Sequence, residues 1–143
     1  MESLLAPLLA LTGHCYVGQV APDAMDEHCF TAMYGGQHVR DTHRVIGKSG
    51  VVYRGETIYS VEGSAVAFTY LSSIGGIGRG TAVLSPGAWR FTMSMRAIPA
   101  DKPTPISIDW QWQGVTAYTV SGGPAPVTYR RTVSVPTDIV PLR

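Results

Sequence analysis

Apolar and polar residues alternate along most of this chain, and turn sequences interrupt the alternation about every ten residues. In residues 89–97, for example, single polar residues separate Trp89, Phe91, Met93, Met95 and Ala97. A two-residue period places these side chains on one face of a β-strand, whereas a helix would need a period near 3.6. The pattern therefore predicts an all-β protein.

The spacing of the turns predicts about ten antiparallel strands joined in sequential order. They are expected at residues 14–20, 26–34, 37–46, 51–61, 65–72, 78–84, 88–98, 106–112, 115–120 and 127–135. Short loops make sequence neighbours pair as hairpins, and such a sheet must close on itself or leave long exposed edges. Closure predicts a single up-and-down β-barrel with room for a small ligand. A Greek-key sandwich is the alternative, but it needs longer connections.

The length of 143 residues suits one domain, so we expect residues 1–143 to form one barrel domain. The apolar run at 4–11 contains Pro7 and has no Lys or Arg before it, which predicts a short capping helix over 1–12 rather than a signal peptide. Residues 136–143 are expected to be a C-terminal tail. No apolar stretch is long enough for a membrane span.

The charged residues exclude one class of partner. Eleven basic and ten acidic residues leave a formal net charge of +1, and no block of like charge occurs. A nucleic-acid-binding protein needs a concentrated basic surface, so no nucleic-acid partner is expected. The sequence leaves open whether the chain forms a homodimer.

The turn at Gly35 and Gly36 allows the second and third strands to be aligned. A two-residue turn there places His28 opposite His43 and Phe30 opposite Asp41. The face that these residues share is rich in aromatic and apolar groups, so we expect it to point into the barrel. It carries His14, Tyr16, His28, Phe30, Ala32, Tyr34, Val39, Asp41, His43 and Val45.

The two cysteines lie on the other face of the same strands. A loop at residues 21–23 places Cys15 opposite Cys29 on adjacent strands. Cα atoms of such an antiparallel pair can lie about 4.5 Å apart, which a disulfide tolerates. We therefore expect a Cys15–Cys29 disulfide on the outer face, with two reduced thiols as the alternative. A disulfide would indicate a periplasmic or secreted protein, and free thiols a cytoplasmic one.

The expected interior contains a polar cluster of His14, His28, Asp41 and His43, with Tyr16 beside them. Ionisable groups inside a barrel are costly unless they pair or serve a ligand. The cluster could be a hydrogen-bonded network at a barrel mouth, a ligand anchor, a metal site or an acid–base pair. No HxH or HExxH spacing supports a metal, and no cofactor is expected.

The fourth strand can be aligned in two ways. A three-residue turn after Gly47 points Tyr53, Gly55, Thr57 and Tyr59 inward, and leaves room at Gly55 opposite His43. A two-residue turn points Arg54 and Glu56 inward instead. We favour the first register because tyrosines suit a core better than an arginine and a glutamate.

The sequence also resembles a known family over about its first sixty residues. Residues 9–18 (LALTGHCYVG) are similar to the opening motif of small, uncharacterised bacterial lipocalin-like domains of the calycin superfamily, in which a short helix leads into Leu-x-Gly-x-Trp-x-Gly. The stretches 26–30, 34–36 and 55–59 resemble the segments that follow, although Tyr16 replaces the usual tryptophan. The resemblance implies a barrel that binds small apolar ligands, distantly like fatty-acid-binding barrels and nitrobindin. Nitrobindin takes its haem-binding histidine from late in the chain, and no histidine follows His43 here.

These observations predict a barrel that binds a small apolar molecule and has no catalytic residues. The expected polar anchor is His28, His43 and Asp41. The expected apolar lining is Tyr34, Tyr59, Phe68, Tyr70, Trp89, Phe91, Met93 and Trp110. The alternative is a small lyase, isomerase or metal-dependent enzyme that uses the same His28/His43/Asp41 cluster. A structural protein with a filled interior is the third possibility.

Overall fold

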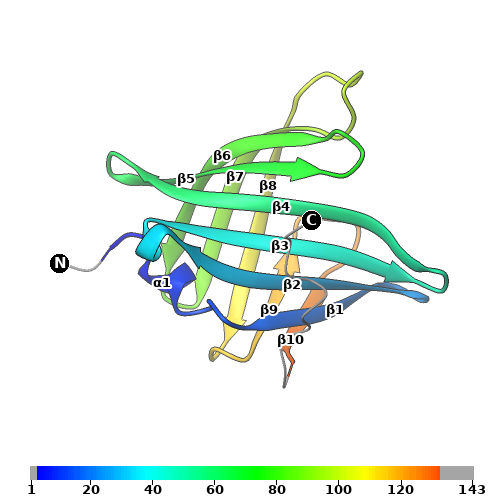
Figure 1. The fold of residues 1–143 in the computed structure, drawn as a ribbon, viewed down its shortest axis with the longest axis horizontal. Helices are drawn as coiled ribbons and strands as arrows, with labels where there is room; N and C mark the ends of the chain where they lie inside the picture. Colours follow the sequence, from blue (N-terminus) through cyan, green and yellow to red (C-terminus); the bar gives the residue numbers. More distant parts are fainter. Residues whose placement is uncertain (1–2, 133–143) are drawn as a thin grey trace.

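The structure, a computed structural model, describes residues 3–132 as one closed β-barrel with a short helix at one end (Figure 1). The helix is α1 (Ala6–Leu9). The strands are β1 (Cys15–Ala21), β2 (Ala24–Met33), β3 (His38–Gly47), β4 (Gly50–Glu62), β5 (Ala65–Ser72), β6 (Ile77–Ser85), β7 (Ala88–Arg96), β8 (Thr104–Gln113), β9 (Ala117–Ser121) and β10 (Val127–Arg131).

Every strand pairs antiparallel with its sequence neighbours, and β1 pairs with β10 to close the barrel. Tyr16 lies opposite Arg131 at this closure. This strand order confirms the predicted all-β, up-and-down barrel of ten strands. Closure leaves no strand edge of the sheet unpaired. The expected tenth strand, 127–135, runs past the described residues, and the expected tail at 136–143 lies wholly outside them.

The helix α1 and the residues around it close one end of the barrel (Figure 1). Leu5, Leu8 and Leu11 are at most 3% exposed and join the same core as Tyr16 and Phe30. Burying each leucine contributes about 1.5–3 kcal/mol. The helix is shorter than the expected 1–12 and covers only Ala6–Leu9. Within residues 3–132, no helix has both the length and the apolar character needed to cross a membrane.

The β3–β4 hairpin reaches the favoured register by a different route from the predicted one. Gly47 pairs with Gly50, so the turn has two residues rather than three. A β-bulge then shifts the register after Val45, which pairs with Tyr53. The extra residue in β4 restores the inward orientation of the tyrosines, because one inserted residue moves every following side chain to the other face.

The β2–β3 turn places Tyr34 differently from the prediction. The last paired residues are Met33 and His38, and a 3-10 turn, Tyr34–Gly36, lies between them. Tyr34 has a φ of 51° and is 80% exposed. The strand has already ended at this position, so the two-residue alternation that predicted an inward side chain no longer applies.

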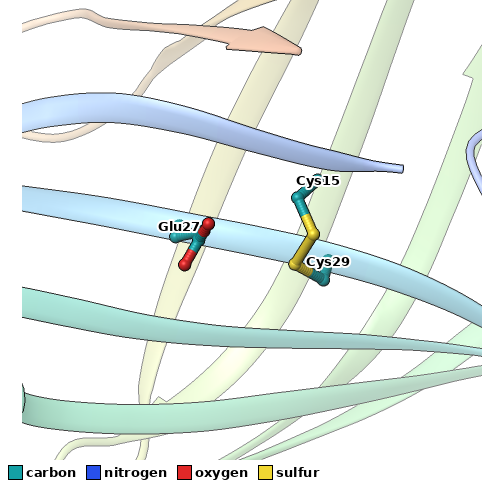
Figure 2. A group of neighbouring side chains, drawn as sticks. All are labelled: Cys15, Glu27 and Cys29. Carbon is teal, nitrogen blue, oxygen red and sulfur yellow. A yellow bond between two sulfur atoms is a disulfide. The ribbon is translucent and has the colours of Figure 1, made fainter. Parts of the chain in front are cut away.

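The predicted disulfide joins β1 to β2 (Figure 2). Cys15 lies opposite Cys29 with their Cα atoms 4.1 Å apart. These residues alternate with the inward-facing Tyr16 and His28, so the bond lies on the outward side of the wall, as predicted. Both cysteines are nevertheless buried. Glu27 lies beside them on the same face, where it accepts a hydrogen bond from Arg44 Nε at 3.0 Å.

Candidate functional site

A cavity of about 270 Å³ occupies part of the barrel interior. The described residues that line it are His28, Asp41, His43, Thr57, Tyr59, Phe68, Tyr70, Phe91, Met93, Met95, Ile106, Ile108, Trp110, Val120 and Tyr129. The helix α1 packs beside Gly36 of the β2–β3 turn and Leu84 near the β6–β7 turn. Successive hairpins turn at alternate ends of the barrel, so the β3–β4, β5–β6 and β7–β8 turns surround the other end, which α1 leaves uncovered.

Most of the predicted lining reaches this cavity. The predicted residues that line it are His28, Asp41, His43, Tyr59, Phe68, Tyr70, Phe91, Met93 and Trp110. Two predicted residues do not reach it: Tyr34 is exposed at the β2–β3 turn, and Trp89 packs against Trp110 and Trp112 in the core. The alternation correctly predicted that Trp89 points inward. It did not indicate that packed aromatic side chains, and not the cavity, occupy the part of the interior next to Trp89.

His28 lies between two carboxylates. Its Nδ1 is 2.8 Å from Asp41 Oδ1, and its Nε2 is 3.0 Å from Asp26 Oδ2. A carboxylate only accepts, so both ring nitrogens must donate, and His28 is an imidazolium. Burial alone would lower the pKa of His28, but Asp41 and Asp26 outweigh burial and hold this pKa well above its usual value.

Asp26 connects the two histidines. Besides the bond from His28, it accepts hydrogen bonds from His43 Nδ1 at 2.9 Å and from Tyr129 Oη at 2.7 Å. Burial opposes its ionisation, but the charge and hydrogen bonds of His28, with those of His43, hold the pKa of Asp26 well below its usual value. Both oxygens of this buried carboxylate are therefore occupied by protein donors.

The sequence reasoning missed both Asp26 and Tyr129 as members of the cluster. Asp26 could have been found, because it lies two residues before His28 and thus on the same strand face. Tyr129 gave no such signal: it reaches Asp26 only because β10 closes the barrel against β1.

A chain of hydrogen bonds leads away from the second histidine. His43 Nε2 lies 2.9 Å from Tyr70 Oη, which lies 2.9 Å from Tyr53 Oη. A neutral His43 would accept the Tyr70 hydroxyl proton at Nε2, whereas a protonated His43 would donate to that hydroxyl. Asp41, His28, Asp26, His43, Tyr70 and Tyr53 thus form one connected polar chain along the barrel wall.

Several polar atoms of this region, an oxygen of Asp41 and the hydroxyl of Tyr118 among them, have no protein partner among residues 3–132. Asp41 bonds His28 through Oδ1 alone, although it is only 2% exposed and lines the cavity. The buried hydroxyl of Tyr118 also has no partner there. Burial raises the pKa of Tyr118 well above its usual value, and the negative charge of Asp41 adds to the effect. Both atoms can accept a hydrogen bond, and the hydroxyl can also donate one.

His14 does not join the cluster that it was expected to join. It lies half-buried just before β1, where its backbone bonds Phe30. Its side chain makes none of the hydrogen bonds that connect the cluster among the described residues. Tyr16 points inward but donates to the backbone oxygen of Val115 at 3.0 Å instead. Neither His14 nor Tyr16 therefore belongs to the hydrogen-bonded cluster at the cavity.

The cluster contains one combination of groups that could hold a metal ion. Asp26, His28 and His43 each offer a ligand atom within 4.8 Å of the others. However, the two imidazole rings are stacked, with an interplanar angle of 15° and centroids 4.8 Å apart. Lone pairs lie in the ring plane, so nearly parallel stacked rings do not direct them at one point. In this geometry each ring instead takes one oxygen of Asp26.

No protein-family model matches the sequence, and no curated protein matches it either.

Proposed function

We propose that this protein binds a small, largely apolar molecule inside its barrel. The observation that carries the proposal is the cavity of about 270 Å³, in which apolar and aromatic side chains surround one polar cluster. Ligand sites are typically built in this way, with an apolar lining for affinity and a few polar groups for orientation. The volume lies just below the roughly 300–1,000 Å³ usual for drug-sized ligands, so a compact ligand is expected.

The polar cluster supports the proposal because it lies in the cavity wall. His28, Asp41 and His43 all line the cavity, and Asp41 keeps one oxygen free of protein partners among residues 3–132. A network that served stability alone would be expected to satisfy all of its acceptors. The free oxygen gives a ligand a polar atom to bind, as the predicted His/Asp anchor requires.

The proposal includes the predicted lipocalin-like relationship and an oxidising compartment. Ten sequentially connected strands closed around a cavity suit the family that the first sixty residues resemble. The Cys15–Cys29 disulfide supports a periplasmic or secreted location, because such bonds persist mainly in oxidising environments.

Acid–base catalysis is the second candidate function, and the polar chain favours it. Asp41, His28, Asp26 and His43 are linked by successive hydrogen bonds of 2.8–3.0 Å. Such a chain can hold or pass a proton next to a ligand in the cavity. A nuclear magnetic resonance (NMR) titration of the histidines tests this candidate, because independent titration at ordinary values would count against it.

Binding can be tested with the neutral fluorescent probe N-phenyl-1-naphthylamine. Energy transfer from Trp110, which lines the cavity, should report saturable binding at micromolar concentrations. Val120→Phe adds volume at the cavity wall and should weaken probe binding at least tenfold. Val83→Phe is the matched control, because Val83 is 64% exposed on the barrel surface. No saturable binding, or equal effects of the two substitutions, would contradict the proposal.

Native mass spectrometry of protein purified from the cells that make it gives an independent test. A co-purified molecule would add mass to the chain. An intact disulfide would make the chain two hydrogens lighter than the reduced form. A reduced chain would contradict the proposed oxidising location.

A further inference from the structure

The charges around the cavity are unbalanced, and the imbalance bears on the ligand. Asp26 and Asp41 contribute two carboxylates, and His28, bonded to a carboxylate at each nitrogen, contributes one imidazolium. When His43 is neutral, the cluster therefore has a net charge of −1. None of the fifteen described residues that line the cavity is Lys or Arg. The cavity wall is thus better suited to a positive charge than to a negative one.

The position of the free acceptor adds to this argument. Both oxygens of Asp26 already accept hydrogen bonds from His28, His43 and Tyr129. Asp41 lines the cavity and uses only Oδ1 within the described part of the chain. A ligand that meets the cluster at Asp41 therefore meets an acceptor, so its polar group must be a donor.

The aromatic lining favours a cation as well. Tyr59, Phe91 and Trp110 all line the cavity, and Phe91 packs against both of the others at ring-centroid distances of 6.2 Å and 4.9 Å. Aromatic ring faces are negative, and they attract ammonium groups most strongly where water is excluded. An anion in the same place would meet these faces and the carboxylate of Asp41.

We propose that the cavity selects an apolar molecule that carries a protonated amine, with the ammonium group donating to the free oxygen of Asp41. This inference rests on the proposed binding function and specifies the ligand class. The ammonium charge would offset the carboxylate charge that the single imidazolium of His28 leaves unbalanced. A fatty acid or other apolar carboxylate of the same size would be excluded, because its head group would place a second carboxylate beside that of Asp41, which offers it no donor.

The test compares three naphthalene compounds that differ in the head group. 1-Naphthylmethylamine is a cation at pH 7, 1-naphthylmethanol is neutral, and 1-naphthoic acid is an anion. Each displaces N-phenyl-1-naphthylamine from the wild-type protein in a competition titration. We expect the amine to bind at least tenfold more tightly than the acid, with the alcohol between them. Equal affinities, or tighter binding of the acid, would overturn the inference.

The role of Asp41 is tested by Asp41→Asn, which keeps the shape and removes the charge. The ratio of the amine affinity to the acid affinity should then fall to within about threefold of one, because a neutral side chain at position 41 no longer discriminates between the two head groups by charge. Asp109→Asn is the control, since Asp109 pairs with Arg90 on the exposed surface and should leave the ratio unchanged. A folded Asp41→Asn protein that keeps the wild-type ratio would overturn the assignment to Asp41.

A second substitution covers the case in which Asp41→Asn fails to fold. Thr57 lies directly opposite Asp41 across the β3–β4 pair and also lines the cavity. Thr57→Lys supplies an internal ammonium, so it should weaken the amine at least tenfold and strengthen the acid. An unchanged preference would contradict the inference. If the wild-type protein fails to bind N-phenyl-1-naphthylamine at all, the binding function fails, whereas probe binding with no amine preference refutes only the ligand class.

Discussion

Gly55 of β4 lies directly opposite His43 of β3, and the absence of a side chain there makes room for the imidazole. A Cβ atom at this position would lie 2.5 Å from His43 Nε2 and would also overlap the hydroxyl of Tyr70. The hydrogen bond between His43 and Tyr70 therefore depends on a glycine at position 55.

Gly55→Ala should destabilise the protein by about 1–3 kcal/mol, because the added methyl group overpacks a filled site. Urea denaturation would measure the loss. Gly47→Ala in β3 is the matched control: a Cβ there would make only ordinary contact, 3.5 Å from Val52. Equal effects of the two substitutions would show that the contact with His43 and Tyr70 does not set the cost.

The sequence predicted those parts of the site that short turns determine. The turn at residues 34–37 sets the pairing of β2 with β3, so His28 opposite His43 could be predicted from it. The loop at residues 21–23 likewise allowed Cys15 to be placed opposite Cys29. The space at Gly55 was predicted from the preference for inward tyrosines, although the turn length assumed for that register was wrong. Local alternation carries this information because each strand face is defined by a period of two.

Other parts could not be predicted, because they depend on contacts between distant segments. Tyr129 reaches Asp26 across 103 residues, and only the β1–β10 closure makes this contact. The bulge in β4 compensates for a turn that is one residue shorter than expected. Trp89 does not line the cavity because packed side chains fill the barrel at its position along the barrel axis. Strand alternation tells which face a residue lies on, but not where along the axis the cavity begins.

Tyr129→Phe should lower the free energy of unfolding by about 1.5–3 kcal/mol, since a buried carboxylate oxygen loses a hydrogen bond. The Tyr129 hydroxyl donates to Asp26 at 2.7 Å and has a pKa raised by burial and by Asp26. Urea denaturation at pH 7 would measure the change. Tyr34→Phe removes a hydroxyl from a side chain that is 80% exposed, and it should change stability by less than about 0.5 kcal/mol. A neutral Tyr129→Phe would contradict the role given to this bond.

Replacing both Cys15 and Cys29 by alanine should lower stability by about 2–4 kcal/mol. The disulfide joins residues 14 apart in sequence, and it limits the freedom of the β1–β2 hairpin in the unfolded chain. Adding reductant to the wild-type protein should produce a similar loss and should leave the double variant unaffected. A double variant as stable as the oxidised wild type would show that pairing between β1 and β2 needs no covalent support.

The raised pKa of His28 determines how the stability of the protein should change with pH. Its pKa is raised well above the unfolded value of 6.5, by Asp41 and Asp26 against the opposing effect of burial. The folded state therefore binds a proton that the unfolded state releases above pH 6.5. This contribution is complete below pH 6.5 and is lost as pH rises toward the folded pKa, by up to about 1.4 kcal/mol per pH unit.

Urea denaturation between pH 6.5 and 9 should therefore show wild-type stability falling as the pH rises. In His28→Gln that slope should be absent, because the variant has no proton to lose at this position, although its stability at pH 6.5 should be lower than that of the wild type. His38→Gln is the matched control, since His38 bonds Ser60 and lies on the strand face opposite that of the cluster. It should keep the wild-type slope. An unchanged slope in His28→Gln would mean that His28 is not held as an imidazolium between Asp26 and Asp41, and the charge count that favours an amine ligand would fail with it.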